Sequence, residues 1–241
     1  MVARADAADA SSPGQGGGRG AALIFVAAAA ICAMPFLLHP EIDLVVARWL
    51  WDAQGGRFQP PTGWFWPIYV GLRPLFYATA AGVAVVGVYN ALRGTRLLGL
   101  DRRAAIYVLL ALGLGPGLVA EIGFKDHWGR ARPREIVEFG GTQRFTPAFQ
   151  PADQCATNCS FVSGHAALAF GFAPLAFLLR GRRRRAALAA VAAAGLGIGA
   201  MRMVQGAHFL SDVIFAGFVV VGIAWALAAL VLKPEPRPGA R

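Results

Sequence analysis

The stretch that decides the fold runs from Phe209 to Leu232 and reads FLSDVIFAGFVVVGIAWALAALVL. Asp212, near its start, is its single charged residue. A run of about 20 mostly apolar residues is long enough to cross the hydrocarbon core of a bilayer as an α-helix. We therefore expect a transmembrane helix here, with Asp212 near one membrane surface.

Five other apolar segments precede this one, at about residues 21–38, 68–89, 104–124, 164–179 and 186–201. Hydrophobic residues make up 56% of the 241 residues. Charged residues make up 15%, against about a quarter in soluble domains. The sequence predicts an all-α integral membrane protein with one six-helix transmembrane domain at residues 21–232. A disordered tail is expected at residues 1–20 and a cytoplasmic tail at 233–241. We interpret the first segment as an uncleaved helix rather than a signal peptide.

The basic residues predict the orientation. The loops after the second and fourth segments and the C-terminal tail are rich in arginine and lysine, whereas the loop after the first segment is mildly acidic. Positively charged loops stay in the cytoplasm, so both termini are expected there. The net charge of +10 then reflects topology and contact with anionic lipids rather than nucleic-acid binding.

One loop departs from this rule. The segment between the third and fourth spans holds Lys125, Arg130, Arg132, Arg134 and Arg144, yet six spans place it outside. Charged groups close to the membrane usually mark function when they converge. This cluster is therefore the main functional indication in the sequence.

Three polar clusters stand at the outer ends of the last four segments. The first reads KDHWGRARP over residues 125–133, and the second reads SGH over residues 163–165. The third comprises Arg202, His208 and Asp212. Because each cluster lies at an outer helix end, we expect all three to reach the same membrane level.

Several of these residues suit a phosphate group. Lys125, Arg132 and Arg202 provide three positive charges, which favour a multiply charged anion. Ser163 and Gly164 stand where a helix is expected to begin, and free backbone N–H groups there attract anions. The sequence thus predicts an anion pocket without a metal.

The remaining residues supply reactive groups. His208 and Asp212 are four positions apart and share a helix face, so the carboxylate can hold one imidazole nitrogen as N–H while the other attacks. His165, on another helix, can give a proton to the leaving oxygen. Metal binding is disfavoured, because no carboxylate cluster accompanies the histidines and cations crowd the same place.

The three motifs, in this order and at these spacings, resemble the phosphatidic acid phosphatase type 2 (PAP2) superfamily. Lipid phosphatases, bacterial acid phosphatases and vanadium haloperoxidases belong to it. The resemblance implies a PAP2-like helical bundle, a phosphohistidine mechanism and no cofactor. Val162 and Met201 replace the proline and serine that are usual in the family. The implied roles are nucleophile for His208, orienting partner for Asp212, general acid for His165, and phosphate binding for Lys125, Arg132, Ser163, Gly164 and Arg202.

Cys155 and Cys159 lie in the same outer loop, separated by three residues. A disulfide can persist outside the cytoplasm, and one here would hold the approach to Ser163. We expect this disulfide, with free thiols as the alternative. Cys32, in the first segment, is expected in the core.

The expected function is hydrolysis of a phosphate monoester or pyrophosphate of a lipid. The resemblance implies a place in the inner membrane of a bacterium, with the active site facing the periplasm. The stretch from Lys125 to Ser163 is most similar to bacterial lipid A 1-phosphatases, and Arg130, Arg134 and Arg144 would suit a large anionic headgroup. Alternative substrates are phosphatidylglycerol phosphate, phosphatidic acid and undecaprenyl pyrophosphate. From other classes, we considered a vanadate-dependent haloperoxidase and a lipid-binding or transport protein. The expected partners are the lipid phosphate substrate and membrane lipids, with no nucleic acid and no obligate protein partner.

Overall fold

The structure, a computed structural model, describes residues 16–63 and 65–232. In this part of the chain it contains helices, loops and two isolated β-bridges, with no strand. The tails expected at residues 1–15 and 233–241 lie outside the described residues. The expectation of disorder up to residue 20 is wrong for its last five residues, because α1 begins at Gly16. Extending an existing helix costs far less than starting one, so the apolar run propagates into the glycine-rich stretch before it.

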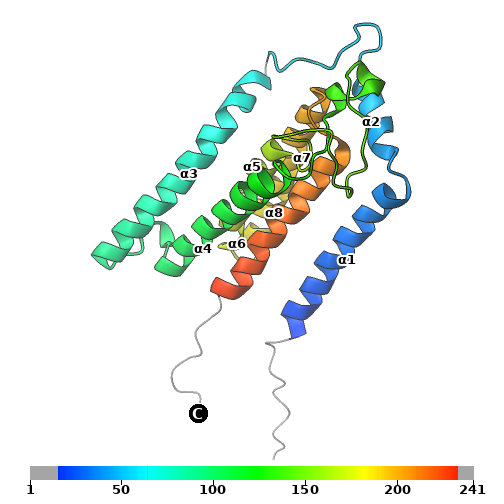
Figure 1. Cartoon of the computed structure of the whole chain (residues 1–241). Coiled ribbons are helices and arrows are strands. Elements are labelled where there is room, and N and C mark those ends of the chain that lie inside the picture. Colours follow the sequence, from blue (N-terminus) through cyan, green and yellow to red (C-terminus); the bar gives the residue numbers. More distant parts are fainter. Residues whose placement is uncertain (1–15, 64, 233–241) are drawn as a thin grey trace, which may run out of the picture.

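The helical segments are arranged as a bundle (Figure 1). In chain order they are α1 (Gly16–Leu38), α2 (Ile42–Leu50), α3 (Phe65–Arg93), η1 (Leu97–Gly99), α4 (Arg102–Leu112), η2 (Gly113–Phe124), η3 (Pro133–Glu135), η4 (Val137–Phe139), α5 (Gly164–Phe170), α6 (Ala173–Phe177), α7 (Gly181–Val204) and α8 (Leu210–Val231).

Five stretches of the described chain are long and apolar enough to cross a membrane. They are Gly20–Leu38, Trp66–Arg93, Arg102–Phe124, Gly181–Val204 and Leu210–Val231. The fourth predicted span, at residues 164–179, is instead a shorter apolar stretch in which α5 ends at Phe170 and α6 begins at Ala173. Pro174 lacks the N–H group needed to continue the ladder from α5.

This interrupted stretch lies inside the bundle. Helix α5 packs against α3, η2, α7 and α8 and appears between them in Figure 1. Glycines allow the close approach: a Cβ at Gly195 would overlap the Phe170 ring, and one at Gly199 would overlap Val213. Small residues at helix contacts are the usual means of packing helices in lipid. A broken helix is tolerated at membrane depth where protein surrounds it.

The third predicted span consists of α4 followed by η2, a π-helix that contains Pro116. Proline removes a helical hydrogen bond, and the wider π-turn is a common way to continue through such a defect. The π-helix packs on α8. It ends at Phe124 and makes Lys125 its C-cap.

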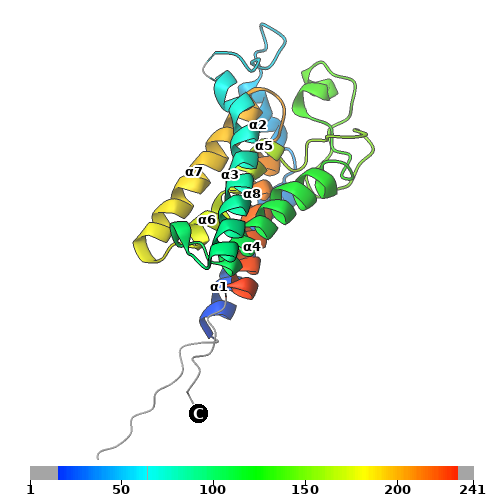
Figure 2. The same ribbon diagram turned by 90° about the vertical axis from the view of Figure 1, so that its left-hand side faces the viewer.

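Helix α2 was not expected from the sequence, which we interpreted as a loop between the first two spans. It buries Asp43 and Ala47 and packs on α7 and α8. Figure 2 shows α2 at the same end of the bundle as the 125–163 loop. The N-terminal segment therefore contributes to that end of the molecule.

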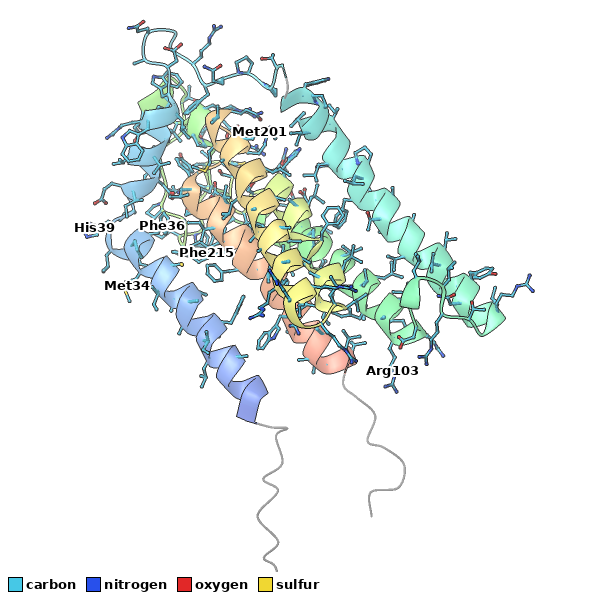
Figure 3. All side chains as sticks on the ribbon, turned by 180° about the vertical axis from the view of Figure 1, so that it is seen from behind. Met34, Phe36, His39, Arg103, Met201 and Phe215 are labelled. Atoms are coloured by element: carbon cyan, nitrogen blue, oxygen red, sulfur yellow. A yellow bond between two sulfur atoms is a disulfide. The ribbon has the colours of Figure 1, made fainter. Side chains whose placement is uncertain are left out.

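The arginine-rich segments lie at the other end. Figure 3 labels Met201, beside Arg202, and Arg103 at opposite ends of the helices. Helix α1 starts and helix α8 ends at the end of the bundle where α4 begins, as Figure 1 shows. The expectation that these arginines occupy loops is partly wrong: α4 begins at Arg102 and α7 at Gly181, so several of them belong to first helical turns.

Candidate active site

A cavity of about 720 Å³ lies where α3 and α5 begin and α7 ends. Its wall combines residues of these helices with residues of the 125–163 loop. The predicted site residues that line it are Lys125, Arg132, His165, Arg202 and His208. The structure thus brings together side chains from four separate parts of the chain.

Three cations in this wall are almost completely buried. Lys125, Arg132 and Arg202 are 5%, 6% and 6% exposed, and the carboxylates of the wall are those of Glu121 and Glu135. Burial lowers the pKa of Lys125 to about 8, with the Glu121 carboxylate acting in the opposite direction. The excess of positive charge makes the cavity a receptor for an anion.

Arg132 is oriented by the loop opposite to it. Its Nη2 donates to the carbonyl oxygen and the side-chain oxygen of Asn158, at 2.5 and 2.9 Å. Its Nε lies 3.9 Å from Glu135 Oε1. Its Nη1 also donates to the Ala207 carbonyl oxygen at 3.5 Å, which leaves the second N–H of Nη1 available to phosphate oxygens.

Two buried polar atoms at the site have no hydrogen-bond partner among the described residues, Ser163 Oγ and Arg202 Nε. The Ser163 N–H donates to the carbonyl oxygen of Asp212 at 3.0 Å, which ties the start of α5 to α8. Arg202 Nη1 donates to Gln205 Oε1. An unpaired buried polar group costs about 1–3 kcal/mol, so these two atoms are well suited to bind a ligand.

Gly164 provides a close approach beside Ser163. A Cβ at this position would overlap the Glu121 carboxylate and lie 3.3 Å from Lys125 Nζ. The glycine therefore lets the start of α5 pack directly on the last turn of η2. It also brings Glu121, four residues before Lys125 in the chain, to the edge of the cavity.

His208 is 2% exposed and is held mainly by the backbone. Its Nδ1 donates to the Ser160 carbonyl oxygen at 2.8 Å, whereas Asp212 Oδ2 is 3.7 Å away, beyond hydrogen-bond distance. The carboxylate therefore acts on this ring through its charge. Burial lowers the pKa of His208 to about 3 against the opposing effect of Asp212. The imidazole is neutral, and with the proton on Nδ1 its Nε2 keeps a lone pair.

Asp212 is fully buried and takes part in a network centred on Arg130. It accepts hydrogen bonds from Ser160 Oγ at 2.5 Å, from the Phe209 N–H at 2.8 Å and from Arg130 Nη1 at 2.6 Å. On its other side, Arg130 Nη2 pairs with Asp43 Oδ2 at 2.8 Å. One guanidinium therefore joins α2 to the carboxylate behind the proposed nucleophile.

The expectation that Arg130 helps to bind a headgroup is wrong. Its side chain is 0% exposed, and its guanidinium carbon lies 4.2 Å from the ring centroid of Phe209. Arg134, by contrast, is exposed and lines the cavity, and Arg144 is exposed outside it. The sequence does not reveal this difference, because the carboxylate partners are distant in the chain.

Backbone pairing within the 125–163 loop positions these groups. The Cys159 N–H donates to the Lys125 carbonyl and the Ser160 N–H to the Arg130 carbonyl, both at 2.8 Å. Gly129 has a φ of +70°, and a Cβ there would overlap the backbone of Ala152. Backbone hydrogen bonds thus hold the first motif, residues 125–133, against the loop segment that carries the Ser160 carbonyl.

His165 meets a residue that was not expected at the site. The ring of Tyr69, from α3, stacks on its imidazole with centroids 4.9 Å apart and planes 8° apart. Tyr69 and Arg73 both line the cavity, although neither belongs to a recognised motif. The sequence feature that could have pointed to this part of the site is Arg73, because a charged residue inside an apolar segment often marks function.

The histidine of the first motif, His127, is exposed, and its Nδ1 donates to the Ile122 carbonyl oxygen at 2.8 Å. It does not line the cavity.

Cys155 and Cys159 are joined by a disulfide with their Cα atoms 5.6 Å apart. Cys155 and Asn158 both line the cavity, so the bridge closes a short loop beside Arg132.

The donor set offers little to a metal ion. Among the described residues, no group of three or more His, Cys, Asp or Glu side chains is arranged to hold one. The two histidines stand instead among cations, which compete with a metal for the same anionic ligands. The arrangement is suited to bind a phosphate group and to transfer it to a neutral imidazole.

Comparison with known proteins also indicates a phosphatase. The family model described as PAP2 superfamily matches residues 104–237. A protein named lipid A 4'-phosphatase from Francisella tularensis subsp. novicida is 33% identical over 206 residues, which is 83% of this chain and 90% of the relative. A lipid A 4'-phosphatase from Rhizobium leguminosarum is 37% identical over 66% of this chain and 70% of the relative. No solved structure matches the chain.

The family match and the lipid A phosphatase relatives, together with the apolar helices, identify a membrane lipid phosphatase. The chain belongs to the PAP2 superfamily. The bacterial relatives and the apolar helices together indicate a bacterial membrane protein. The expected similarity to lipid A 1-phosphatases is met in part, because the relatives are lipid A phosphatases whose names give the 4' position.

Proposed function

We propose that the protein is a lipid A phosphatase that removes the 4'-phosphate at the outer face of the inner membrane. The observation that carries the proposal is the cavity in which the neutral imidazole of His208 meets three buried cations. The relatives support the substrate and favour the 4' position over the 1 position expected at first.

The proposed reaction has two steps. His208 Nε2 attacks phosphorus, the bond from phosphorus to the sugar oxygen breaks, and His165 gives its proton to that oxygen. Water then attacks phosphorus, His165 takes a proton from this water, and the bond from phosphorus to His208 Nε2 breaks, which releases inorganic phosphate and the neutral imidazole. Arg132, Arg202 and Lys125 bind the equatorial oxygens and stabilise the charge that develops on them.

The full reaction requires no metal in this account. We expect purified protein in detergent to release phosphate from a lipid phosphate at an undiminished rate in excess chelator, because buried cations supply the charge that a metal would supply. Vanadate should inhibit by copying the five-coordinate transition state. Phosphate release that stops in chelator and returns with a divalent cation would contradict this part of the proposal.

We further propose that α5 and α6 together form a sixth, broken span, and that both termini are cytoplasmic. The α3–α4 connection and the start of α7 lie at the end of the bundle that Figure 3 marks with Arg103, opposite the Met201 end. Their arginines are therefore on the side that the positive-inside rule assigns to the cytoplasm.

Cysteine labelling of intact spheroplasts tests this orientation. A Cys32→Ala background removes the free thiol. Thr142 and Arg183 are exposed at opposite ends, whereas a side chain at the neighbouring Gly141 would overlap the backbone of Glu135. A membrane-impermeant maleimide should label Thr142→Cys and not Arg183→Cys. The reverse pattern would place the reaction at the cytoplasmic leaflet.

A further inference from the structure

Tyr69 lies in the first turns of α3, outside the segment that the family model matches. It is half-buried and lines the site cavity. Its ring contacts two residues at once: it stacks on the His165 imidazole, and the Arg202 guanidinium carbon lies 4.9 Å from its centroid. No other aromatic ring among the described residues touches both of these groups.

We propose that Tyr69 is a positioning residue of the active site, whose ring fixes the orientation of the general acid His165 and of the phosphate-binding Arg202. The inference rests on the proposed function, since it assigns to Tyr69 an effect on the roles given there to the other two residues.

The contact with His165 restricts a rotation. The torsion that turns an imidazole about its bond to Cβ has a broad distribution when nothing restrains it. A ring stacked almost parallel, with planes 8° apart, allows little of that rotation. The imidazole also hydrogen-bonds the Tyr69 backbone, a contact that side-chain variants of Tyr69 keep. The Tyr69 ring therefore fixes the plane in which the other nitrogen faces the leaving oxygen, as general acid catalysis requires.

The contact with Arg202 determines which side of the guanidinium faces the Tyr69 ring. A guanidinium that lies over an aromatic ring uses its flat face, so its N–H edge remains free for phosphate oxygens. Of the N–H groups of Arg202, Nη1 donates to Gln205, while Nε has no partner in the described chain. The ring of Tyr69 and the amide of Gln205 thus leave Nε as a donor available to the phosphate.

Both contacts involve the aromatic ring of Tyr69 and not its hydroxyl group. Two variants of Tyr69 can therefore separate the effect of the ring from that of the hydroxyl group. Tyr69→Phe keeps the stack and the cation contact, whereas Tyr69→Leu keeps an apolar side chain and loses both. The full-length variants are purified in detergent and compared with wild type by thermal unfolding. Their kcat and KM are then measured on a lipid phosphate and on an aryl phosphate whose leaving group needs no proton.

We expect Tyr69→Phe to keep kcat within about twofold on both substrates. Tyr69→Leu should lower kcat on the lipid phosphate by roughly tenfold or more. The loss on the aryl phosphate should be smaller, because the proton from His165 is not needed there. Unchanged kcat in Tyr69→Leu, equal losses on the two substrates, or an equal defect in Tyr69→Phe would each overturn the inference. Failure of the wild type to release phosphate from either substrate would instead refute the proposed function.

Discussion

His208→Ala should lower phosphate release by at least hundreds-fold, without a comparable loss of stability. Removing a group that forms a covalent intermediate or stabilises charge in the transition state commonly costs this much. His208 places a buried imidazole in the cavity wall, and its Nδ1 is already engaged by the Ser160 carbonyl, so Nε2 is left to attack. Initial rates on a lipid phosphate measure the loss.

The chain offers a matched control in His127→Ala. That histidine belongs to the same outer loop but is exposed and outside the cavity, so its removal should leave the rate near wild type. Rapid quenching with radiolabelled substrate should also trap an acid-labile phosphoprotein in wild type and none in His208→Ala. Substantial turnover by His208→Ala would refute the phosphohistidine mechanism.

Arg130→Met should destabilise the protein by about 3–5 kcal/mol, the usual effect of removing one partner of a buried ion pair. The change leaves two carboxylates, Asp43 and Asp212, buried without their common cation. The position of Asp212 behind His208 should be lost as well, so activity should fall together with stability. Unfolding in detergent, followed by tryptophan fluorescence, measures the first effect.

Arg144→Met is the control, because Arg144 lies in the same loop but is exposed. It should leave the unfolding midpoint within experimental error of wild type. A double-mutant cycle isolates the pair: Asp43→Asn should cost less stability in the Arg130→Met background than in wild type. Additive effects of the two changes would show that the Arg130–Asp43 pair is not coupled.

The sequence predicted most of the membrane architecture because bilayer thickness imposes a length on every apolar run. Five of the expected segments correspond to helices of sufficient length. The break between α5 and α6 was missed because Ala, Gly and Phe read as apolar whether or not the helix is continuous. Helix α2 was missed because a nine-residue amphipathic helix gives no transmembrane signal.

At the site, the motif residues could be predicted because their chemistry and spacing point to phosphate. The contacts that hold them could not, since they join distant parts of the chain. Asp43 is far from Arg130 in sequence, and the partner of His208 Nδ1 is a backbone carbonyl, which any residue supplies. Tyr69 was overlooked because an aromatic residue at the start of an apolar helix is ordinarily interpreted as an interfacial anchor.

The central claim, that the substrate is lipid A, is tested most directly in cells. The protein is expressed in a bacterium whose lipid A carries two phosphates, beside His208→Ala as a control, and the lipid A is examined by mass spectrometry. We predict a species lighter by one phosphate in wild type alone, with fragments that place the loss at the 4' position. Unchanged lipid A, together with rapid hydrolysis of a glycerophospholipid phosphate by the same purified protein, would contradict the claim.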